Sequence, residues 1–175
     1  HGLVNAVGLC LQTWTAPGDG VMLFTPVYHA FARVIHAAGR KVIECPMVEV
    51  DGLYQMDLDI AEGLVDAATR MVILCSPHNP GGRGWSAEEL RAVADFCARH
   101  DLLLVSDEIH HDLVMPGHEH TVMPLAAPEH MDRVVMLTAP SKTFNIAGTH
   151  CGQVIIPDES LRARFVQTLG ALGIS

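Results

Sequence analysis

Residues 71–82 read MVILCSPHNPGG, and this stretch decides the fold. Five consecutive apolar residues, Met71–Cys75, run directly into a turn that is rich in Pro, Asn and Gly. A strand that is apolar at every position, rather than at alternate positions, is buried on both faces, as the strands of parallel sheets are. The turn residues that follow are those that end a strand and begin a loop.

Similar apolar runs recur along the chain and alternate with helical patterns. We predict strands at residues 21–24, 41–44, 71–75, 102–105, 133–138 and 153–156. We predict helices at residues 3–14, 28–38, 58–68, 86–100 and 158–169, with Asp57 as an N-cap and Ser86 opening a capping box. This alternation predicts an α/β fold with three layers (αβα) around a mostly parallel, doubly wound sheet.

The composition indicates a folded, acidic domain. The 175 residues are 49% hydrophobic and carry a formal net charge of −9. The apolar content excludes a disordered chain, and the lack of a Lys/Arg cluster argues against a nucleic-acid partner. No apolar run approaches the roughly 20 residues of a membrane span, so no membrane partner is expected. The five scattered cysteines, which form no C-x-x-C pair, favour a reduced, cytoplasmic protein.

The two ends of the sequence favour a longer parent chain. The first residue is His1 rather than Met, and a helical pattern begins directly after it. The last residues, Gly173-Ile174-Ser175, follow a helix that is still unfinished. We therefore expect residues 1–175 to form the central part of a larger domain.

Polar residues follow the carboxyl ends of three predicted strands. Ligands of a doubly wound sheet bind beyond these ends, so the side chains placed there are the candidates for chemistry. They are Asn79, then Asp107 with Glu108 and His110, and then Ser141 with Lys142.

Three of these residues have both an ordinary and a chemical interpretation. Lys142 is either a solvated surface lysine or a semi-buried amine that can form a Schiff base. Asp107 either caps a turn or holds a ring-nitrogen cation at the bottom of a pocket. Asn79 is either a turn residue or a hydrogen-bond donor to a phenolate oxygen.

An aromatic side chain and several anion donors complete the set. Tyr28 follows a strand and is either a core aromatic residue or a surface on which a ring can stack. The hydroxyls of Ser141 and Thr138 can donate to an anion. The backbone of Gly2 and Leu3, at a helix N-terminus, offers N–H groups to a phosphate. Together these groups supply an amine, a carboxylate, an amide and an aromatic face at one edge of the sheet.

Other kinds of site are not supported. A dinucleotide-binding G-x-G-x-x-G motif would need a third glycine where Leu23 stands, and the Ser-Lys-Thr at 141–143 lacks both phosphate-loop glycines. The histidine-rich stretch 110–120 contains no H-E-x-x-H spacing, so we expect surface histidines there rather than a metal site. Glu108 is expected to be structural.

Three segments together resemble the signatures of fold-type I pyridoxal 5'-phosphate (PLP) enzymes. They are Ser76-Pro77-His78-Asn79-Pro80-Gly81-Gly82, then Ser106-Asp107-Glu108-Ile109-His110, and then residues 138–146, TAPSKTFNI. Their order and spacing match this superfamily, which includes the class I/II aminotransferases. Within it, the chain is most similar to the cystathionine β-lyase group (MalY/PatB-like C–S lyases).

The resemblance implies a role for each candidate residue. Lys142 would bind PLP covalently and move the α-proton of the substrate. Asp107 would pair with the pyridinium nitrogen, Asn79 would hydrogen-bond the ring oxygen O3′, and Tyr28 would stack on the ring. The phosphate would be held by a set of donors that comprises Ser141, Thr138 and the backbone of Gly2 and Leu3. His110 would also lie in the cofactor site.

Two departures from the aminotransferase pattern bear on the subgroup. Aminotransferases carry Tyr three residues after the aspartate and Arg eight residues after the lysine, whereas this chain has His110 and His150. Both substitutions fit the lyase group better. The absent arginine weakens the phosphate site, so other donors must compensate.

The resemblance therefore implies a PLP-dependent C–S β-lyase. Such an enzyme cleaves a cystathionine- or cysteine-type amino acid to pyruvate, ammonia and a thiol. Residues 1–175 would be the central part of its PLP-binding large domain, with an N-terminal segment and a C-terminal small domain outside them. The full-length protein would be a homodimer. Two alternatives stay open: an aminotransferase of the same fold, and a PLP-fold regulator that acts through a protein partner.

Overall fold

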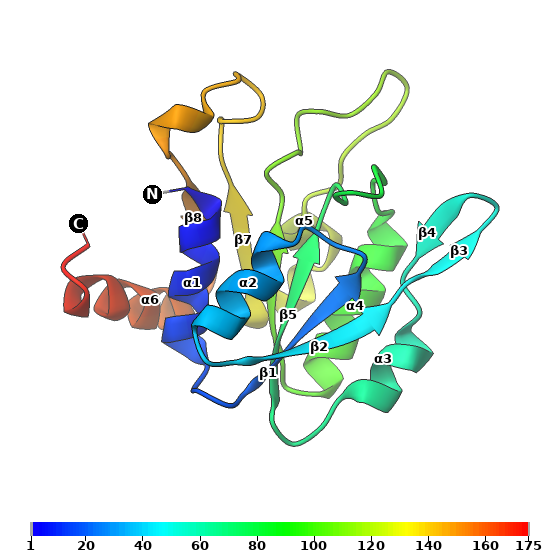
Figure 1. Ribbon diagram of the computed structural model, residues 1–175. Helices are drawn as coiled ribbons and strands as arrows, with labels where there is room; N and C mark the ends of the chain where they lie inside the picture. The colour runs from blue at the N-terminus through cyan, green and yellow to red at the C-terminus, as the bar shows by residue number, and fades with distance from the viewer. Residues whose placement is uncertain (1, 175) are drawn as a thin grey trace.

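A six-stranded sheet forms the centre of the computed structural model, which describes residues 2–174. The strands lie in the order β2-β1-β5-β6-β7-β8 (Figure 1). Neighbours from β2 to β7 run parallel, and β8 pairs antiparallel with β7. The sheet strands are β1 (Gly20–Thr25), β2 (Lys41–Pro46), β5 (Thr69–Cys75), β6 (Leu103–Asp107), β7 (Val134–Thr138) and β8 (Gln153–Ile155).

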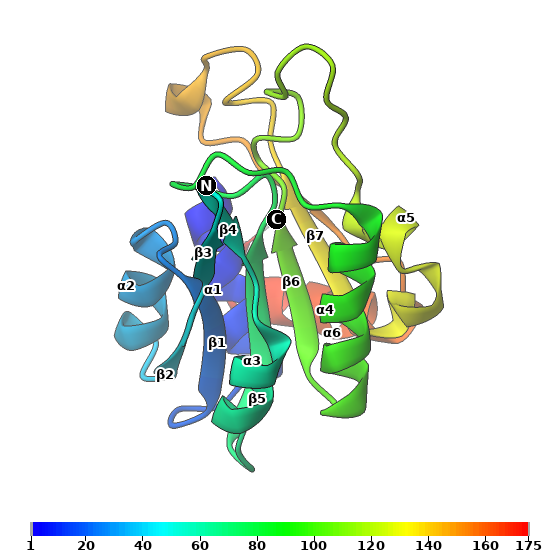
Figure 2. The ribbon, with the colours of Figure 1, turned by 90° about the vertical axis from the view of Figure 1, so that its right-hand side faces the viewer.

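Helices cover both faces of this sheet and make the predicted three layers. Figures 1 and 2 show α1, α2 and α6 on one face and α3, α4 and α5 on the other. The first group comprises α1 (Leu3–Trp14), α2 (Ala30–Ala37) and α6 (Glu159–Ala171). The second comprises α3 (Leu58–Leu64), α4 (Ala87–Arg99) and α5 (Met123–Ala126). No helix among residues 2–174 is long and apolar enough to cross a membrane.

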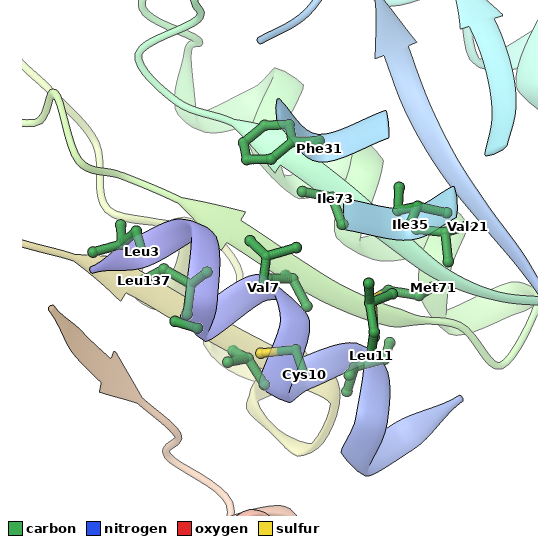
Figure 3. Packing of buried hydrophobic residues seen from close by; sticks show 14 of the residues in the cluster. Leu3, Val7, Cys10, Leu11, Val21, Phe31, Ile35, Met71, Ile73 and Leu137 are labelled. Carbon is green, nitrogen blue, oxygen red and sulfur yellow. The ribbon is translucent and has the colours of Figure 1, made fainter. Parts of the chain in front are cut away.

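Alternate residues of each buried strand face opposite layers, and this divides the core into two clusters. In β1, Val21 and Leu23 pack toward α1, whereas Met22 and Phe24 pack toward α4. Figure 3 shows the first cluster, where Val7, Cys10 and Leu11 of α1 lie against the sheet. Because both faces are covered, the central strands are apolar at almost every position.

The predicted elements are found, with some changes at their ends. Asp57 accepts hydrogen bonds from the backbone N–H groups of Asp59 and Ile60, and Ser86 forms the predicted capping box with Glu89. Helix α3 was predicted to reach residue 68 but ends at Leu64. The next residues form a separate turn, in which Asp66 Oδ1 accepts from Ala68 N and Thr69 Oγ1.

Several short elements were not predicted. The antiparallel hairpin of β3 (Val48–Val50) and β4 (Leu53–Gln55) stands apart from the main sheet. Two 3₁₀ segments, at Pro128–Arg133 and Ala147–Thr149, and the four-residue α5 are also new. Beyond the carboxyl edge of the sheet, two long segments rise side by side in Figures 1 and 2: residues 109–122 and 139–152.

Candidate active site

A pocket of about 170 Å³ opens at the carboxyl edge of the sheet. It lies at the ends of β5, β6 and β7 and beside the first turn of α1, the place where a doubly wound sheet binds ligands. The sequence-predicted residues among its lining are Gly2, Leu3, Tyr28, Asn79, Asp107, His110, Ser141 and Lys142. The structure thus brings eight candidates from distant parts of the chain into one cavity.

Asp107 lies at the end of β6 and is only 5% exposed. Its Oδ1 accepts a hydrogen bond from Ile109 N at 3.1 Å, and among residues 2–174 it has no ion-pair partner. The pKa of Asp107 is raised to about 7, chiefly by burial and to a smaller extent by the charge of Glu108, while the Ile109 hydrogen bond and the Lys142 charge lower it. A buried carboxylate of this kind favours a ligand that brings a positive charge to it.

Asn79 is placed by the turn that follows β5. The turn is closed by hydrogen bonds from His78 N to Arg83 O (2.7 Å) and from Gly82 N to His78 O (2.8 Å). The buried His78 donates from Nε2 to Pro26 O at 2.8 Å, which ties this turn to the loop after β1. Burial lowers the pKa of His78, so the ring is neutral at pH 7 and keeps a proton for this bond.

Tyr28 lies on the loop after β1, two residues after Pro26. Its ring packs edge-on against Phe31 of α2, with ring centroids 5.7 Å apart, and both residues line the pocket. The tyrosine is therefore half-buried beside the cavity rather than enclosed in the core. Its position suits a flat ligand that stacks on its ring.

Lys142 lines the pocket from the segment after β7, and it is exposed. Of the two interpretations of Lys142, the structure shows the exposed amine and not the semi-buried one. The reason is local, because Lys142 belongs to a segment that rises from the sheet, and Phe144 on it is 68% exposed. His110 lines the same pocket, and its pKa is lowered by burial and by the Lys142 charge.

Gly2, Leu3 and Ser141, which are expected to hold a phosphate, also line the pocket. Helix α1 begins here, and the N–H groups of its first turn have no partner within the helix. A Cβ on Gly152 would lie 3.0 Å from Leu3 Cδ1 and 3.4 Å from the Gly2 carbonyl carbon, so this glycine lets residues 150–152 approach the helix start. Ser141 and His150 also face this space. Such a group of donors at a helix N-terminus suits a phosphate.

Thr138 is not among the lining residues. It is the last residue of β7 and pairs with Gln153 of β8. Its hydroxyl oxygen lies 3.0 Å from His111 Nδ1, so this interaction engages the group that was expected to face a phosphate.

The structure also adds residues that the sequence did not single out. Cys75, Phe31 and Ile109 line the pocket, and Cys75 lies directly beside Asp107 in the β5–β6 register. Burial, with a smaller contribution from the Asp107 charge, raises the pKa of the Cys75 thiol to about 12. Cys75 is therefore a neutral wall of the pocket and not a nucleophile.

The donor set fits PLP. Asp107 offers a buried, unpaired carboxylate for a ring-nitrogen cation, Tyr28 a ring face, and the start of α1 a phosphate site. Lys142 offers an amine within the same cavity. These are the groups that a pyridine ring with an aldehyde and a phosphate requires.

Comparison with known proteins agrees with this geometry. The chain is 41% identical to cystathionine beta-lyase PatB of Bacillus subtilis over 174 residues, which is 99% of this chain and 45% of PatB. It is 31% identical to kynurenine–oxoglutarate transaminase 3 of Rattus norvegicus, over 91% of this chain and 36% of the transaminase. The chain therefore spans less than half the length of these relatives.

A solved structure is similar throughout. Cystalysin from Treponema denticola, whose crystal structure contains a pyridoxal 5'-phosphate cofactor, superposes with a TM-score of 0.94 at 44% identity. The match covers 99% of this chain and 44% of cystalysin. The model of the family described as aminotransferase class I and II matches residues 1–172. The chain belongs to this family of PLP-dependent enzymes.

Proposed function

We propose that the protein carrying this chain is a PLP-dependent C–S β-lyase. The observation that carries the proposal is the meeting of Lys142, Asp107 and Asn79 in one pocket, in a chain 41% identical to a cystathionine β-lyase. The substrate would be an L-amino acid with a thiol or thioether on Cβ, such as L-cystathionine or L-cysteine. The products would be pyruvate, ammonia and a thiol.

Each residue has a definite part in this proposal. PLP, when bound, supplies an electron sink for the bond broken at Cα. The Lys142 amine holds the cofactor and then takes the α-proton of the substrate, as a base within reach of Cα. Asp107, in its ionised form, keeps a proton on the ring nitrogen. Asn79 donates its side-chain amide to the ring oxygen, and Tyr28 supports the ring face.

His110 stands where the aminotransferase pattern has tyrosine. Burial and the nearby Lys142 charge lower the pKa of its imidazole, so it is neutral at pH 7. A neutral imidazole donates from one ring nitrogen and accepts at the other, whereas a phenol has only its hydroxyl. We assign His110 to the cofactor site, where this pair of groups replaces the phenol.

The phosphate would be held by the start of α1, through Gly2 and Leu3, and by the Ser141 hydroxyl. His150 occupies the position of the family's arginine and lines the pocket. Thr138 was expected in this group, but its contact with His111 favours a structural role.

An aminotransferase of the same fold is the second candidate. Its support is the 31% identity to kynurenine–oxoglutarate transaminase 3 and the use of the same lysine, aspartate and asparagine. The two activities share their chemistry up to removal of the α-proton. They differ in whether a keto acid is required for turnover.

The test uses the full-length protein loaded with PLP. L-Cystathionine is supplied without a keto acid, and pyruvate and free thiol are measured. Sustained release of both supports the lyase. Turnover only after a keto acid is added supports the aminotransferase, and turnover under neither condition contradicts both activities.

The remaining features of the parent protein are also proposals. Residues 1–175 would be the central part of a PLP-binding large domain, with an N-terminal segment and a C-terminal small domain outside them. We propose a homodimer and a cytoplasmic location. The homodimer is supported by the exposed apolar side chains of Met115 and Phe144, which a second subunit could cover. The reducing, cytoplasmic location is supported by the free cysteines.

A further inference from the structure

The residue after Asp107 has a buried charge that the proposed chemistry does not use. Glu108 is 0% exposed and does not line the pocket. A buried carboxylate is costly unless hydrogen bonds and an ion-pair partner compensate for its lost hydration. The structure supplies three donors. Ser106 Oγ and Met123 N donate to Glu108 Oε1 at 3.0 Å each, and His120 Nε2 donates to Oε2 at 2.6 Å.

These three donors come from three different places. Ser106 belongs to β6, Met123 is the first residue of α5, and His120 lies near the far end of the 109–122 segment. The His120 side chain is itself only 8% exposed. Glu108 therefore joins both ends of this segment at one buried point, while residues 112–119 between them are exposed.

A second histidine, His111, links the Glu108 backbone to the end of β7. The His111 Nδ1–H group lies 2.8 Å from the Glu108 carbonyl oxygen and 3.0 Å from Thr138 Oγ1, so both oxygens accept from it. Glu108 N donates to Leu137 O at 2.8 Å, which extends the β6–β7 ladder by one residue. These bonds hold the end of β6, which carries Asp107, against the end of β7, which leads to Lys142.

We propose that Glu108 and His120 are positioning residues of the cofactor site. The contact between Glu108 and His120 fixes the backbone from Asp107 to His110. It thereby sets the direction from which the Asp107 and His110 side chains face PLP. Neither Glu108 nor His120 touches the cofactor. The proposal rests on the cofactor site proposed above. It also corrects the expectation of surface histidines at residues 110–120, because the His120 side chain is buried against Glu108.

The test is a set of variants of the PLP-loaded, full-length protein. His120→Leu removes the donor, and His120→Gln restores it because the glutamine amide nitrogen can reach the place of Nε2. Glu108→Gln combined with His120→Leu removes the buried charge as well. The matched control is His130→Leu, because His130 Nε2 also donates to a carboxylate, Asp95, at 2.6 Å but lies on the 3₁₀ segment before β7, at the other end of the sheet.

Three quantities are measured: the visible circular dichroism of bound PLP, the dissociation constant of PLP, and kcat and KM for L-cystathionine. For His120→Leu we expect a changed dichroism band and a fall in kcat of about tenfold to a hundredfold, as small misplacements of reacting groups cause. KM should change by less than about threefold. His120→Gln should recover most of the loss, and His130→Leu should behave as the wild type.

Each outcome decides one point. If His120→Leu lowers the unfolding temperature but leaves the dichroism, the PLP affinity and kcat unchanged, the pair is only structural and the proposal is overturned. If His120→Leu does not fold because Glu108 is left unpaired, the uncharged double variant replaces it, and the same changes in dichroism and kcat are expected. A wild type that binds no PLP overturns the cofactor site itself, which the variants alone cannot do.

Discussion

Replacement of Asp107 by Asn should stabilise the cofactor-free protein while weakening the holoenzyme. The Asp107 carboxyl is 5% exposed, and burial raises its pKa from 3.8 to about 7. At about 1.4 kcal/mol per pH unit, this rise corresponds to about 4 kcal/mol of lost stability when the group is ionised. Asparagine keeps an oxygen that can accept from Ile109 N, but it carries no charge.

The sign of the pH dependence follows from the direction of the pKa change. Because the folded-state pKa lies above the unfolded one, the destabilisation is absent below about pH 4, grows between pH 4 and 7, and is complete above pH 7. The free energy of unfolding of Asp107→Asn should therefore exceed that of the wild type by about 4 kcal/mol at pH 8.5 and by about 2 kcal/mol at pH 5.

The assay is urea unfolding of both cofactor-free proteins at these two pH values, with Glu49→Gln on the exposed strand β3 as a control. In the proposed holoenzyme the same substitution would remove a charge-assisted hydrogen bond to the ring nitrogen, so PLP should bind about tenfold to a hundredfold more weakly. A stability difference that does not change with pH would refute the reasoning, because it would mean that Asp107 carries no desolvation penalty.

Three further substitutions test other parts of the account. Lys142→Ala should lower kcat for C–S cleavage by at least about a thousandfold, measured as pyruvate release, while Lys41→Ala should have no effect. Arg40→Met should lower the free energy of unfolding by about 2–4 kcal/mol without changing the affinity for PLP. The reason is that the buried Arg40 guanidinium donates four hydrogen bonds, to Leu11 O, Thr15 O, Thr15 Oγ1 and Ala38 O. Gly81→Ala should cost about 1–3 kcal/mol and weaken PLP binding, because its Cβ would lie 2.8 Å from both His78 and Tyr54. Gly84→Ala, which meets nothing within 4 Å, is the control for urea unfolding and PLP titration.

The central sheet could be predicted because its strands are buried on both faces. A run such as Met71–Cys75 is apolar at each position for that reason, and the polar residue that ends it marks the carboxyl edge. The direction of β8 was not predictable from its apolar run. Direction depends on the connection, and residues 139–152 contain no helix long enough for a parallel crossover.

The β3–β4 hairpin was missed although it has a recognisable signal. Its strands have three residues each and are largely exposed, so no apolar run marks them. The turn residues Asp51 and Gly52 both have positive φ angles, of 51° and 78°. An Asp-Gly pair between short β-rich stretches is the sequence signature of such a turn.

The positions of the site residues could be predicted better than their environments. Asn79, Asp107 and Lys142 follow strand ends, so topology alone brings them to one edge. Thr138 also ends a strand, but it does not line the pocket, and its hydroxyl contacts His111 through a tertiary contact that no local pattern encodes. No local pattern shows that Lys142 is exposed. Nor does one show that Cys75, a buried thiol inside an apolar strand, lines the pocket.

The most direct test of the account identifies the residue that binds PLP. The chain contains only two lysines, Lys142 in the pocket and Lys41 at the start of the edge strand β2. The full-length protein is incubated with PLP, reduced with borohydride and digested, and the modified peptides are identified by mass spectrometry. Within these 175 residues, we expect the label on Lys142 and none on Lys41. A label on Lys41, or none on Lys142, would contradict it.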